Sequence, residues 1–420
     1  MEQIKQIHTL FLNSKGVNTD TRTIKEGELF FALKGENFDG NKYALQAIEN
    51  GAAYAIVDDP SLENKSKQLI LVENVLLSLQ YLANYHRKYW GKEIIGITGS
   101  NGKTTSKELC AAVLTKKYNL HYTAGNFNNH IGVPLTLLKL KPEHELAIIE
   151  MGANHCKEIA ELCAIAEPTH GLITNIGKAH LEGFGSEDNI EKTKRELFDW
   201  VREHHGKAAF INSKDKRLNH EPLPKEKVYF NDNFTVKNNS NFCVIEKKGT
   251  QYSSRLIGKI NAANIDAAIV IGEYFGISES DIKSAIEDYV PSNNRSQLIK
   301  TERNTIILDA YNANPSSMKI AIEDFANQSS DYNNLALIGE MKELGSESEN
   351  YHKEIVELCK SLKLEALFIG ESYQNLVSAE CYYISQESED LRIKLKDLKQ
   401  KHILIKGSRS NKLENLVDLL

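Results

Sequence analysis

Long apolar runs are absent from this sequence, and their absence excludes one large class of proteins. No uninterrupted apolar segment in the 420 residues approaches the ~20 residues that a membrane-spanning helix needs. Residues 1–13 carry charges where a secretory signal peptide has its apolar core. We therefore expect a cytoplasmic protein that does not enter a membrane.

Cysteines are also few, and their spacing is uninformative. The six of them stand at positions 110, 156, 163, 243, 359 and 381, and none form a Cys-x2-Cys pair. This pattern argues against a zinc site and against a disulfide framework. We expect most of these cysteines to be small buried hydrophobic residues.

The sequence has no large excess of charge of either sign. Its formal net charge is −6, which gives no basic face for a nucleic-acid backbone. We expect no nucleic-acid partner, and any anionic ligand must be held by local groups.

What the sequence does contain is a repeated alternation of strands and helices, in a chain long enough for roughly two to four domains. Residues 1–90 predict a small α/β unit, with strands near 28–33 and 53–57. A helical stretch at 43–50 separates these strands, and an amphipathic helix at 76–89 leads out of the unit.

From residue 93 the pattern becomes strand, loop, helix. A buried strand at 93–98 precedes a glycine-rich loop and a helix at 103–118. Further strands are predicted at 146–149, 171–174 and 208–211, with helices near 156–166, 188–204, 261–275 and 279–290. The more polar stretch 226–258 predicts a hairpin insertion. Such alternation is typical of a mostly parallel sheet that is covered on both faces.

The alternation restarts after a predicted hinge at 291–294. Strands are expected at 305–308, 335–338, 366–369 and 402–405, with helices between them. The sequence therefore predicts an α/β protein of three domains, with boundaries at 1–90, 91–294 and 295–420. The central domain is expected to hold a phosphate-binding loop on a parallel sheet, and the last domain to be Rossmann-like.

The glycine-rich loop runs from Gly99 to Thr104, between a strand and a helix. Closely spaced backbone N–H groups and a helix N-terminus can cradle phosphates there. Lys103 can lie between the β- and γ-phosphates, and the Thr104 hydroxyl can bind Mg²⁺. The usual pattern needs glycine where Ile97 stands, so a dinucleotide loop and a structural turn stay open as alternatives. A dinucleotide fold has no use for the lysine and threonines that open this helix.

A triphosphate site also needs a carboxylate at a strand end to hold Mg²⁺. Glu150, which ends the strand predicted at 146–149, can supply it. The alternative is a solvated residue at the edge of the sheet.

Several motifs in the same order resemble the Mur ligases of peptidoglycan synthesis. They are residues 98–105, 125–129, 150–154, 174–182 and 309–315. Residues 311–314, 339–345 and 406–410 resemble the branch of that family that adds D-alanyl-D-alanine. The resemblance covers essentially the whole chain. It implies ATP as cofactor, with UDP-N-acetylmuramoyl-tripeptide and D-alanyl-D-alanine as partners and an acyl phosphate as intermediate.

The resemblance also implies roles for the residues at the centre of the reaction. Lys103 would contact the γ-phosphate, and Thr104 with Glu150 would hold the first Mg²⁺. His180 would hold a second Mg²⁺. Lys194 matches the lysine that is carbamylated by CO₂ in this family, with Lys192 as the alternative; both could instead be solvated helix residues.

The remaining implied contacts to ATP come from three parts of the chain. The loop contributes Gly99, Ser100, Asn101, Gly102, Lys103, Thr104 and Thr105. Asn264 would lie against the adenine, although this sequence has Ile260 where the family carries histidine. Asp309 would bind the ribose and Arg295 the phosphates.

The implied substrate contacts are spread over all three domains. Those to UDP are Asp20, Thr21, Arg22, Lys34 and Gly35, and those to the muramoyl-peptide are Asn126, Asn128 and Asn129. Those to the dipeptide are Asn312, Asn314, Lys406 and Arg409. The alternatives are a surface turn and a strand edge in the first domain, and capping of the last helix by Lys406 and Arg409. We expect a monomer.

Three other functions share part of this pattern. A folylpolyglutamate synthetase has the same core but starts almost at the phosphate loop, whereas about 95 residues precede it here. The ligase that adds the third peptide residue carries an Asp-Asn-Pro-Arg tetrapeptide that this sequence lacks. A nucleotide-binding protein without catalysis is the third alternative, and Lys103, Glu150, His180 and Lys194 argue against it.

Overall fold

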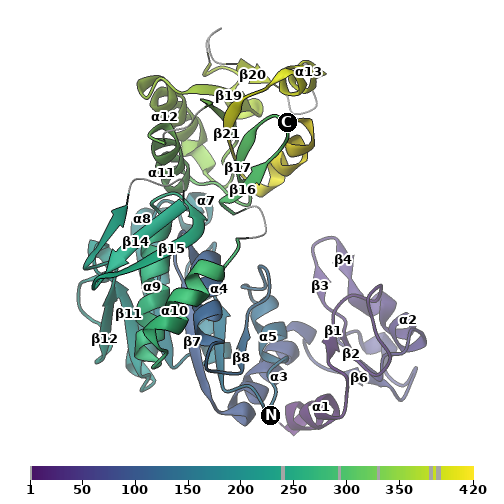
Figure 1. Cartoon of the computed structure of the whole chain (residues 1–420). Coiled ribbons are helices and arrows are strands. Elements are labelled where there is room, and N and C mark those ends of the chain that lie inside the picture. Colours follow the sequence, from purple (N-terminus) through teal and green to yellow (C-terminus); the bar gives the residue numbers. More distant parts are fainter. Residues whose placement is uncertain (1, 238–241, 292–294, 329–331, 378–381, 385–388) are drawn as a thin grey trace.

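The structure, a computed structural model, describes residues 2–237, 242–291, 295–328, 332–377, 382–384 and 389–420. Three α/β units follow one another along the chain (Figure 1). The predicted fold class, an α/β protein of more than one domain with a central parallel sheet, is confirmed, whereas the three domain boundaries stay a prediction. Most of the predicted hinge, and Cys381, lie outside the described residues.

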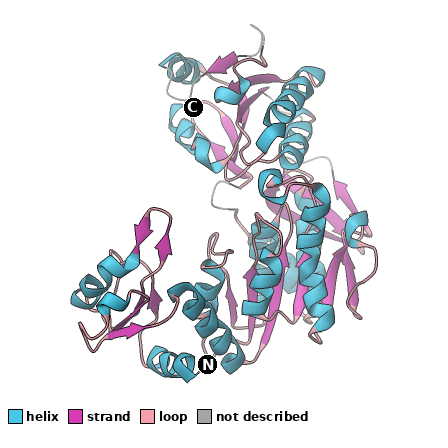
Figure 2. Cartoon of the chain, turned by 180° about the vertical axis from the view of Figure 1, so that it is seen from behind, coloured by secondary structure: helices cyan, strands magenta, loops and turns pink. Residues whose placement is uncertain are grey.

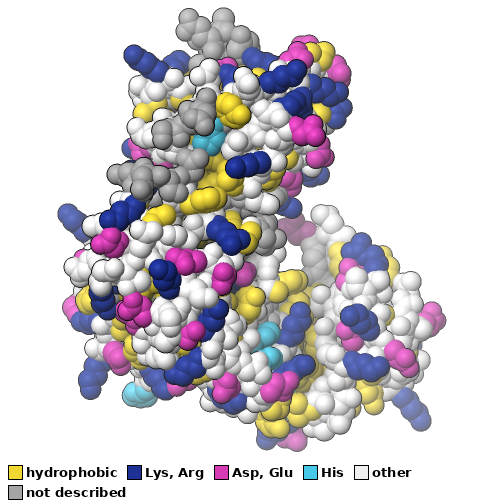
Figure 3. All heavy atoms as spheres, in the orientation of Figure 1, with side chains coloured by type: hydrophobic (Ala, Val, Ile, Leu, Met, Phe, Trp, Pro, Cys, Tyr) yellow, Lys and Arg dark blue, Asp and Glu magenta, His cyan; other side chains and the backbone are white. Residues whose placement is uncertain are grey.

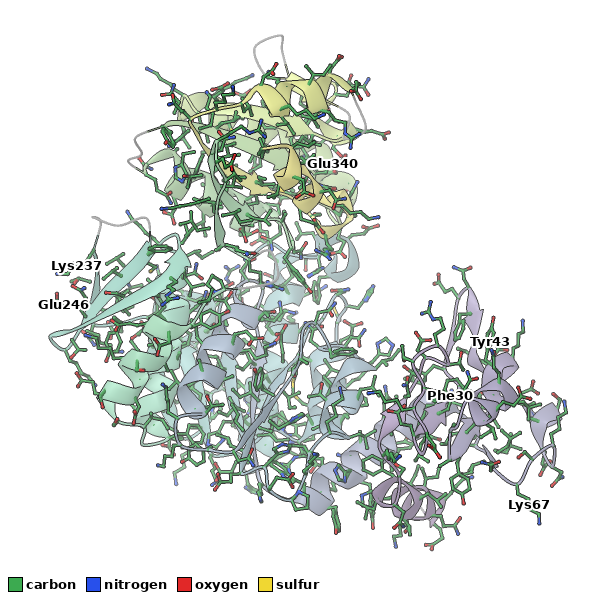
Figure 4. All side chains as sticks on the ribbon, turned by 45° about the vertical axis from the view of Figure 1, so that its right-hand side comes forward. Phe30, Tyr43, Lys67, Lys237, Glu246 and Glu340 are labelled. Atoms are coloured by element: carbon green, nitrogen blue, oxygen red, sulfur yellow. The ribbon has the colours of Figure 1, made fainter. Side chains whose placement is uncertain are left out.

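The N-terminal unit is built on a four-stranded parallel sheet of order β1-β2-β5-β6. Its strands are β1 (Val17–Asn18), β2 (Leu29–Phe31), β5 (Tyr54–Val57) and β6 (Leu69–Leu71). Helix α2 (Ala44–Glu49) packs on the sheet, and β3 (Lys34–Gly35) pairs with β4 (Phe38–Asp39) in a short hairpin. Phe30 lies inside this unit and Tyr43 at its surface (Figure 4).

Helix α3 (Val75–Trp90) connects the N-terminal unit to the rest of the chain. It begins at the N-cap Asn74 and ends at Gly91, whose φ of 72° is the left-handed conformation that glycine adopts without strain. Helix α1 (Glu2–Leu12) packs against α3, which itself packs against α5 (Gly132–Leu137) and α6 (Glu158–Ala166).

Two polar side chains of α3 tie it firmly to the central unit. Arg87 Nε donates to the carbonyl of Ala166 at 2.8 Å, and Trp90 Nε1 donates to that of Lys141 at 3.1 Å. One apolar core runs from Phe31 through α3 to the central sheet. The N-terminal and central units are therefore joined by packing as well as by the chain.

The central unit holds a six-stranded parallel sheet of order β12-β11-β10-β7-β9-β8. Its strands are β7 (Glu93–Thr98), β8 (Leu120–Tyr122), β9 (Leu146–Glu150), β10 (His170–Ile173), β11 (Ala208–Asn212) and β12 (Lys227–Phe230). The chain leaves β7 for β8 on one side and later returns to β10 on the other. The carboxyl end of β7 is thus the switch point at which such sheets bind ligands.

Helices cover both faces of this sheet because alternate strand residues point to opposite sides. Ile94 packs with α3, α5, α6 and α8 (Glu187–Glu203). Its neighbour Ile95 packs with α4 (Lys103–Leu114), α9 (Asn261–Tyr274) and α10 (Glu279–Asp288). This is the two-sided cover that the continuous apolar strands predict.

The hairpin expected at 226–258 is wrong in its first strand. Strand β12 pairs in parallel with β11 and extends the central sheet. Only β13 (Phe234–Lys237), β14 (Phe242–Lys247) and β15 (Thr250–Ile257) form the antiparallel insertion. An ion pair of 2.7 Å between Lys237 and Glu246 crosses from β13 to β14 (Figure 4). An alternating sequence predicts that a segment is a strand, but it does not predict which other strand it pairs with.

The C-terminal unit holds a second six-stranded sheet, of order β16-β17-β21-β18-β19-β20. All its pairs are parallel except that of β16 (Gln297–Lys300) with β17 (Thr305–Asp309). The other strands are β18 (Asn333–Gly339), β19 (Glu365–Ile369), β20 (Tyr382–Ile384) and β21 (Lys401–Lys406). Helices α11 (Pro315–Ala326) and α12 (Ser348–Ser361) cover one face, and α13 (Glu389–Asp397) the other (Figure 2).

Two expectations about whole classes of residue can be checked against this fold. Cys110, Cys163, Cys243 and Cys359 are buried and Cys156 is exposed, so most of the described cysteines are buried as predicted. Within the described residues, none of the helices has both the length and the apolar character needed to cross a membrane.

Candidate active site

A cavity of about 560 Å³ opens where the central and C-terminal units meet. Its walls come from the carboxyl ends of β7 and β9 on one side and of β17 and β21 on the other. The cavity therefore lies at the position where doubly wound sheets place their ligands. A separate hollow lies between the N-terminal unit and the C-terminal unit, above the contact of the N-terminal unit with the central unit (Figure 3).

The phosphate loop is held in a conformation that depends on two glycines. Gly99 and Gly102 have φ values of 142° and 79°, a region that other residues rarely adopt. A Cβ atom on Gly99 would lie 2.0 Å from Thr174 Oγ1, so the loop is packed against the end of β10. Gly102 is the N-cap of α4 and offers no side chain to the first amides of the helix. Those amides are available to an anion.

Lys103 starts helix α4 and turns back over the loop. Its Nζ donates to the carbonyls of Gly99 at 2.6 Å and Ser100 at 3.3 Å. Burial lowers the pKa of this amine to about 8, although the charge of Glu150 opposes that shift. A phosphate anion at the loop would restore the favourable environment of the cation.

Glu150 is 1% exposed and forms the acidic floor of the cavity. Its Oε1 accepts hydrogen bonds from Thr104 Oγ1 at 3.1 Å and from Asn128 Nδ2 at 2.8 Å. Its Oε2 is buried without a hydrogen-bond partner, and the Lys107 ammonium lies 3.7 Å away. A buried carboxylate oxygen without a donor, beside a threonine hydroxyl, suits a hard cation such as Mg²⁺.

Lys107 was not among the predicted site residues, yet it is completely buried. Its Nζ pairs with Glu108 at 2.9 Å and also donates to the carbonyl of Gly125 at 3.3 Å. It thereby connects helix α4 to the loop that carries Asn126, Asn128 and Asn129. The position three residues after Thr104 was the only sequence signal for this role, since it places both side chains on one face of the helix.

The two candidate lysines of helix α8 differ sharply in environment. Lys192 is exposed, whereas Lys194 is 1% exposed and donates from Nζ to the carbonyl of Ala153 at 3.2 Å. Ala153 lines the cavity. Burial, aided by the charge of Lys103, holds the pKa of Lys194 well below its usual value. The lowered pKa favours the neutral form of the amine, which is the nucleophilic form.

His180 lines the cavity from the central unit and contacts the C-terminal unit. Its Nδ1 is hydrogen-bonded to the carboxylate of Glu343. This bond holds the pKa of Glu343 below its ordinary value. Within the described residues, no three side chains of His, Cys, Asp or Glu gather as in a self-contained metal site.

The C-terminal unit brings three further predicted residues to the cavity. The carboxylate of Asp309 is paired with the Lys406 ammonium and accepts from the Ser296 amide at 3.2 Å. The Arg295 guanidinium lies over the Tyr311 ring at 3.7 Å from its centroid, and its buried Nε has no hydrogen-bond partner. Arg295 therefore lines the cavity with an N–H group that is available to a bound anion.

Asn314 joins the C-terminal unit directly to the phosphate loop. Its Nδ2 donates to Asn101 Oδ1 at 2.8 Å, while its Oδ1 caps helix α11. Asn312 lines the same wall. Arg409 does not line the cavity: its side chain is 60% exposed and pairs with Glu414 at 2.9 Å.

On the opposite wall, Asn264 fixes the start of helix α9 to helix α4. Its Oδ1 accepts from Ser106 Oγ at 3.0 Å, and its Nδ2 donates to Asn261 Oδ1 at 3.0 Å. Ile260 and Asn261 lie beside it at the cavity. Asn264 is thus in place to line a nucleotide site, while its side-chain polar groups are already used within the protein.

The residues predicted to bind UDP lie away from this cavity, in the N-terminal unit. The Arg22 guanidinium and Asp20 carboxylate form an exposed two-pronged pair, which lowers the pKa of Asp20 to about 2. The Thr21 carbonyl accepts from Asn50. Lys34, beside Gly35 on the β3–β4 hairpin, pairs with Asp58 at 2.9 Å.

Most of the predicted residues of the central and C-terminal units meet at one cavity. Those that line it are Ser100, Asn101, Gly102, Lys103, Thr104, Thr105, Asn126, Asn128, Asn129, Glu150, His180, Asn264, Arg295, Asp309, Asn312, Asn314 and Lys406. Gly99, Lys194 and Arg409 stand outside its lining. His130, His155, Glu158 and Glu161 also line it and were not predicted, because no motif marks them.

In this cavity a glycine loop with a lysine lies opposite a buried carboxylate, and a second, mostly parallel sheet closes over them. Enzymes that transfer the terminal phosphoryl group of a nucleoside triphosphate have this arrangement. Three family models cover the chain in succession. Residues 13–87 match the "Mur ligase family, catalytic domain", residues 97–272 the "Mur ligase middle domain", and residues 294–409 the "Mur ligase, glutamate ligase domain".

Individual relatives agree with these matches. A protein of Bacillus subtilis called UDP-N-acetylmuramoyl-tripeptide–D-alanyl-D-alanine ligase is 35% identical, over 96% of this chain and 92% of that protein. A protein of Escherichia coli with the same name is also 35% identical, over 96% and 93%. The crystal structure of MurF ligase from Thermotoga maritima in complex with ADP is 26% identical, with a TM-score of 0.84 over 98% of this chain and 97% of that one.

The chain belongs to the Mur ligase family. It is accordingly an ATP-dependent ligase that forms an amide bond.

Proposed function

We propose that this chain joins D-alanyl-D-alanine to a UDP-N-acetylmuramoyl-tripeptide, at the expense of ATP, in the synthesis of peptidoglycan precursors. The observation that carries the proposal is the likeness to ligases of that name over 96% of the chain, which includes all three units. We further propose that it works in the cytoplasm as a monomer, without nucleic-acid or membrane partners.

The proposed reaction has two chemical steps. The terminal carboxylate of the tripeptide attacks the γ-phosphorus of ATP, so that a new O–P bond forms while ADP leaves with the electrons of the old one. The amine of the dipeptide then attacks the acyl carbon, loses its proton, and displaces inorganic phosphate. Repulsion between these anions is the main barrier to bringing them together, so the site must supply positive charge.

Lys103 and the first amides of helix α4 would hold the ATP phosphates. The amine already lies within 2.6 Å of the loop carbonyl of Gly99, so it can move from that carbonyl to a γ-phosphate oxygen without leaving the loop. Arg295 supports the same charge from the C-terminal side, since its buried Nε has no partner. Asn264 would line the adenine and Asp309 the ribose, once Asp309 exchanges part of its pairing with Lys406.

Thr104 and Glu150 would hold a first Mg²⁺, and His180 a second. The orphaned Oε2 of Glu150, buried beside the Thr104 hydroxyl, is the feature that fits a hard cation. When bound, such ions neutralise charge on the phosphates during transfer. Asn128 would keep the Glu150 carboxylate in place through its 2.8 Å hydrogen bond.

Lys194 would carry a carbamate. The neutral form of Nζ would attack the carbon of CO₂, so that an N–C bond forms while one C=O π bond breaks and leaves its electron pair on oxygen. The nitrogen then releases one proton, which turns a potential cation into an anion. The burial of Lys194 and its lowered pKa favour this reaction, whereas Lys192 is exposed and has no such environment. The carbamate would stand beside Ala153 at the cavity.

The three domains would divide the substrates among them. Residues 1–90 would hold the UDP end through Asp20, Thr21, Arg22, Lys34 and Gly35. Residues 91–294 would bind ATP, and Asn126, Asn128 and Asn129 would contact the muramoyl-peptide. Residues 295–420 would bind the dipeptide through Asn312, Asn314, Lys406 and Arg409.

The decisive experiment is a panel of acceptors and amines, read as phosphate release. The acceptors are UDP-muramoyl-peptides of two and three residues and a folate; the amines are D-alanyl-D-alanine, a diamino acid and glutamate. We expect release only with the tripeptide and D-alanyl-D-alanine together. Release with the dipeptide acceptor and a diamino acid would identify the third-residue-adding ligase instead. Release with folate and glutamate would identify a folylpolyglutamate synthetase.

A further inference from the structure

His180 and Glu343 are far apart in the sequence, and their side chains form a contact between the central and C-terminal units. His180 follows β10 in the central unit, while Glu343 follows β18 in the C-terminal unit. The same contact is reinforced by the backbone, because the Glu182 amide donates to the Glu343 carbonyl at 3.2 Å. Two independent bonds thus fix these segments to each other.

Both residues of this pair are held in an unfavourable backbone conformation. His180 has a φ of 52° and Glu343 a φ of 63°, the left-handed region that residues other than glycine seldom occupy. Such conformations persist where the surrounding structure enforces them, and they cluster at functional sites. Here they lie on both sides of one hydrogen bond that borders the cavity.

The chemistry of the bond determines where the imidazole proton lies. A carboxylate can only accept a hydrogen bond, so Nδ1 of His180 must donate. In the neutral ring the lone pair then belongs to Nε2, which has no hydrogen-bond partner among the described residues. Histidines that bind metals commonly use one nitrogen for the ion while a carboxylate or carbonyl fixes the other.

We propose that Glu343 is a positioning residue, supplied by the C-terminal unit, that keeps the His180 proton on Nδ1 and presents Nε2 to a metal ion in the cavity. The inference rests on the proposed role of His180 in binding Mg²⁺. It adds that this ligand is complete only when the C-terminal unit stands against the central unit, because Glu343 arrives with it.

The position of the proton can be measured without metal, substrate or turnover. The full-length protein is labelled with ¹⁵N-histidine, and the His180 ring is identified as the signal that is lost in His180→Gln. We expect wild type to carry the proton on Nδ1. Glu343→Ala should move it to Nε2, the tautomer that an unconstrained imidazole prefers, whereas Glu343→Gln retains an acceptor and should keep it on Nδ1. Glu349→Ala, which removes an exposed carboxylate from α12, is the matched control and should change nothing.

A second measurement tests the metal itself. Binding of Mn²⁺ is titrated in the presence of a non-hydrolysable ATP analogue. We expect Glu343→Ala to weaken the site that His180→Gln also weakens, by roughly 10–100-fold, as for other groups that orient a metal ligand. Glu343→Gln should restore part of the loss. A wild-type proton on Nε2, or Mn²⁺ binding that Glu343→Ala leaves intact, overturns the inference.

Failure of the proposed function would be recognised separately. The acceptor panel measures phosphate release, whereas the imidazole spectrum reports only the position of the proton in the His180–Glu343 pair. A protein that releases no phosphate with any acceptor, yet shows the Nδ1 proton and its loss in Glu343→Ala, would contradict the function while supporting the pair.

Discussion

The two six-stranded sheets present the carboxyl ends of their parallel strands to the same cavity, but the charged groups at those ends differ. At the end of the central sheet the charged groups are deeply buried: Lys107 is 0% exposed, and Glu150 and Lys194 are each 1% exposed. At the end of the C-terminal sheet the ions are paired with one another, and several are open to solvent. The side chains of Lys342 and Arg409 are 50% and 60% exposed while they pair with Glu340 and Glu414.

This difference separates two tasks. Charges that are buried without full pairing cost several kcal/mol to desolvate, by order of magnitude, and they are retained where an anion or cation will complete them. Exposed ion pairs contribute only about 0–1 kcal/mol and can be exchanged for a ligand at little cost. Under the proposed function, the buried charges of the central sheet suit the phosphoryl chemistry, and the exchangeable ion pairs of the C-terminal sheet suit the binding and release of a small substrate.

The largest effect should come from the central sheet. In Lys103→Ala the cation opposite the γ-phosphate is lost, so kcat should fall roughly 10²–10³-fold, as when a single donor to a transition state is removed. The control is Lys116→Ala, an exposed lysine just past the same helix. Phosphate release and thermal unfolding are measured together. Near-normal turnover in Lys103→Ala would show that the loop takes no part in phosphoryl transfer. It would also contradict the division of tasks between the two sheets.

A second test concerns Lys194. Replacement by alanine should lower kcat by about 10²-fold if its carbamate orients a metal, and formate or acetate should restore part of the activity. Because burial lowers the pKa of Lys194, the neutral amine that reacts with CO₂ should be present at lower pH than for an exposed lysine, and removal of CO₂ should reduce turnover. Lys192→Ala, on the same helix but exposed, should be unaffected. The mass of the intact protein reports the modification; an unmodified Lys194 with full activity would count against it.

The third test is on the C-terminal sheet. Arg409→Ala should raise the KM for D-alanyl-D-alanine about tenfold and leave that for ATP unchanged, because one charge-assisted hydrogen bond to a carboxylate is lost. Glu414→Gln breaks the same ion pair without removing the guanidinium. If both variants lose thermal stability equally and neither changes the KM, Arg409 serves only to fix the last helix.

The smallest effect is expected furthest from the cavity. Arg22→Ala should raise the KM for the UDP substrate about fivefold, the scale of an exposed charge contact, with no change for ATP. Among the described residues the Arg22 side chain pairs with Asp20 alone, so we expect its loss to leave the fold intact. Equal effects on both substrates would indicate that the N-terminal unit is destabilised instead.

The sequence was sufficient for features that depend on neighbouring residues. The buried run 93–98, the glycines at 99 and 102 and the lysine that follows are contiguous, so strand, loop and helix could all be predicted. Helix α1 was missed although its buried residues Ile4, Ile7 and Phe11 recur at helical spacing, because the charges in this segment were interpreted only as evidence against a signal peptide. The short strand β8 and helix α5 were missed for lack of length.

Contacts between distant segments were beyond the sequence. Nothing in residues 339–345 indicates that Glu343 reaches His180, because the pairing depends on how the two sheets are placed. The same holds for Asn314 and Asn101. Asp309 and Lys406 were each predicted to face a ligand, and in the structure they face each other, since adjacent parallel strands bring them into register.

The continuous core through helix α3 has a consequence for the length of the substrate. Since the N-terminal and central units share that core, we expect packing to set the span between the β3–β4 hairpin and the phosphate loop. A molecule whose nucleotide is anchored at the hairpin reaches Lys103 with its terminal carboxylate only if its peptide has the right number of residues. Under the proposed function, the junction therefore selects the length of the substrate. A precursor that is one amino acid too short would not place its carboxylate at Lys103, even where every contact to its nucleotide is intact.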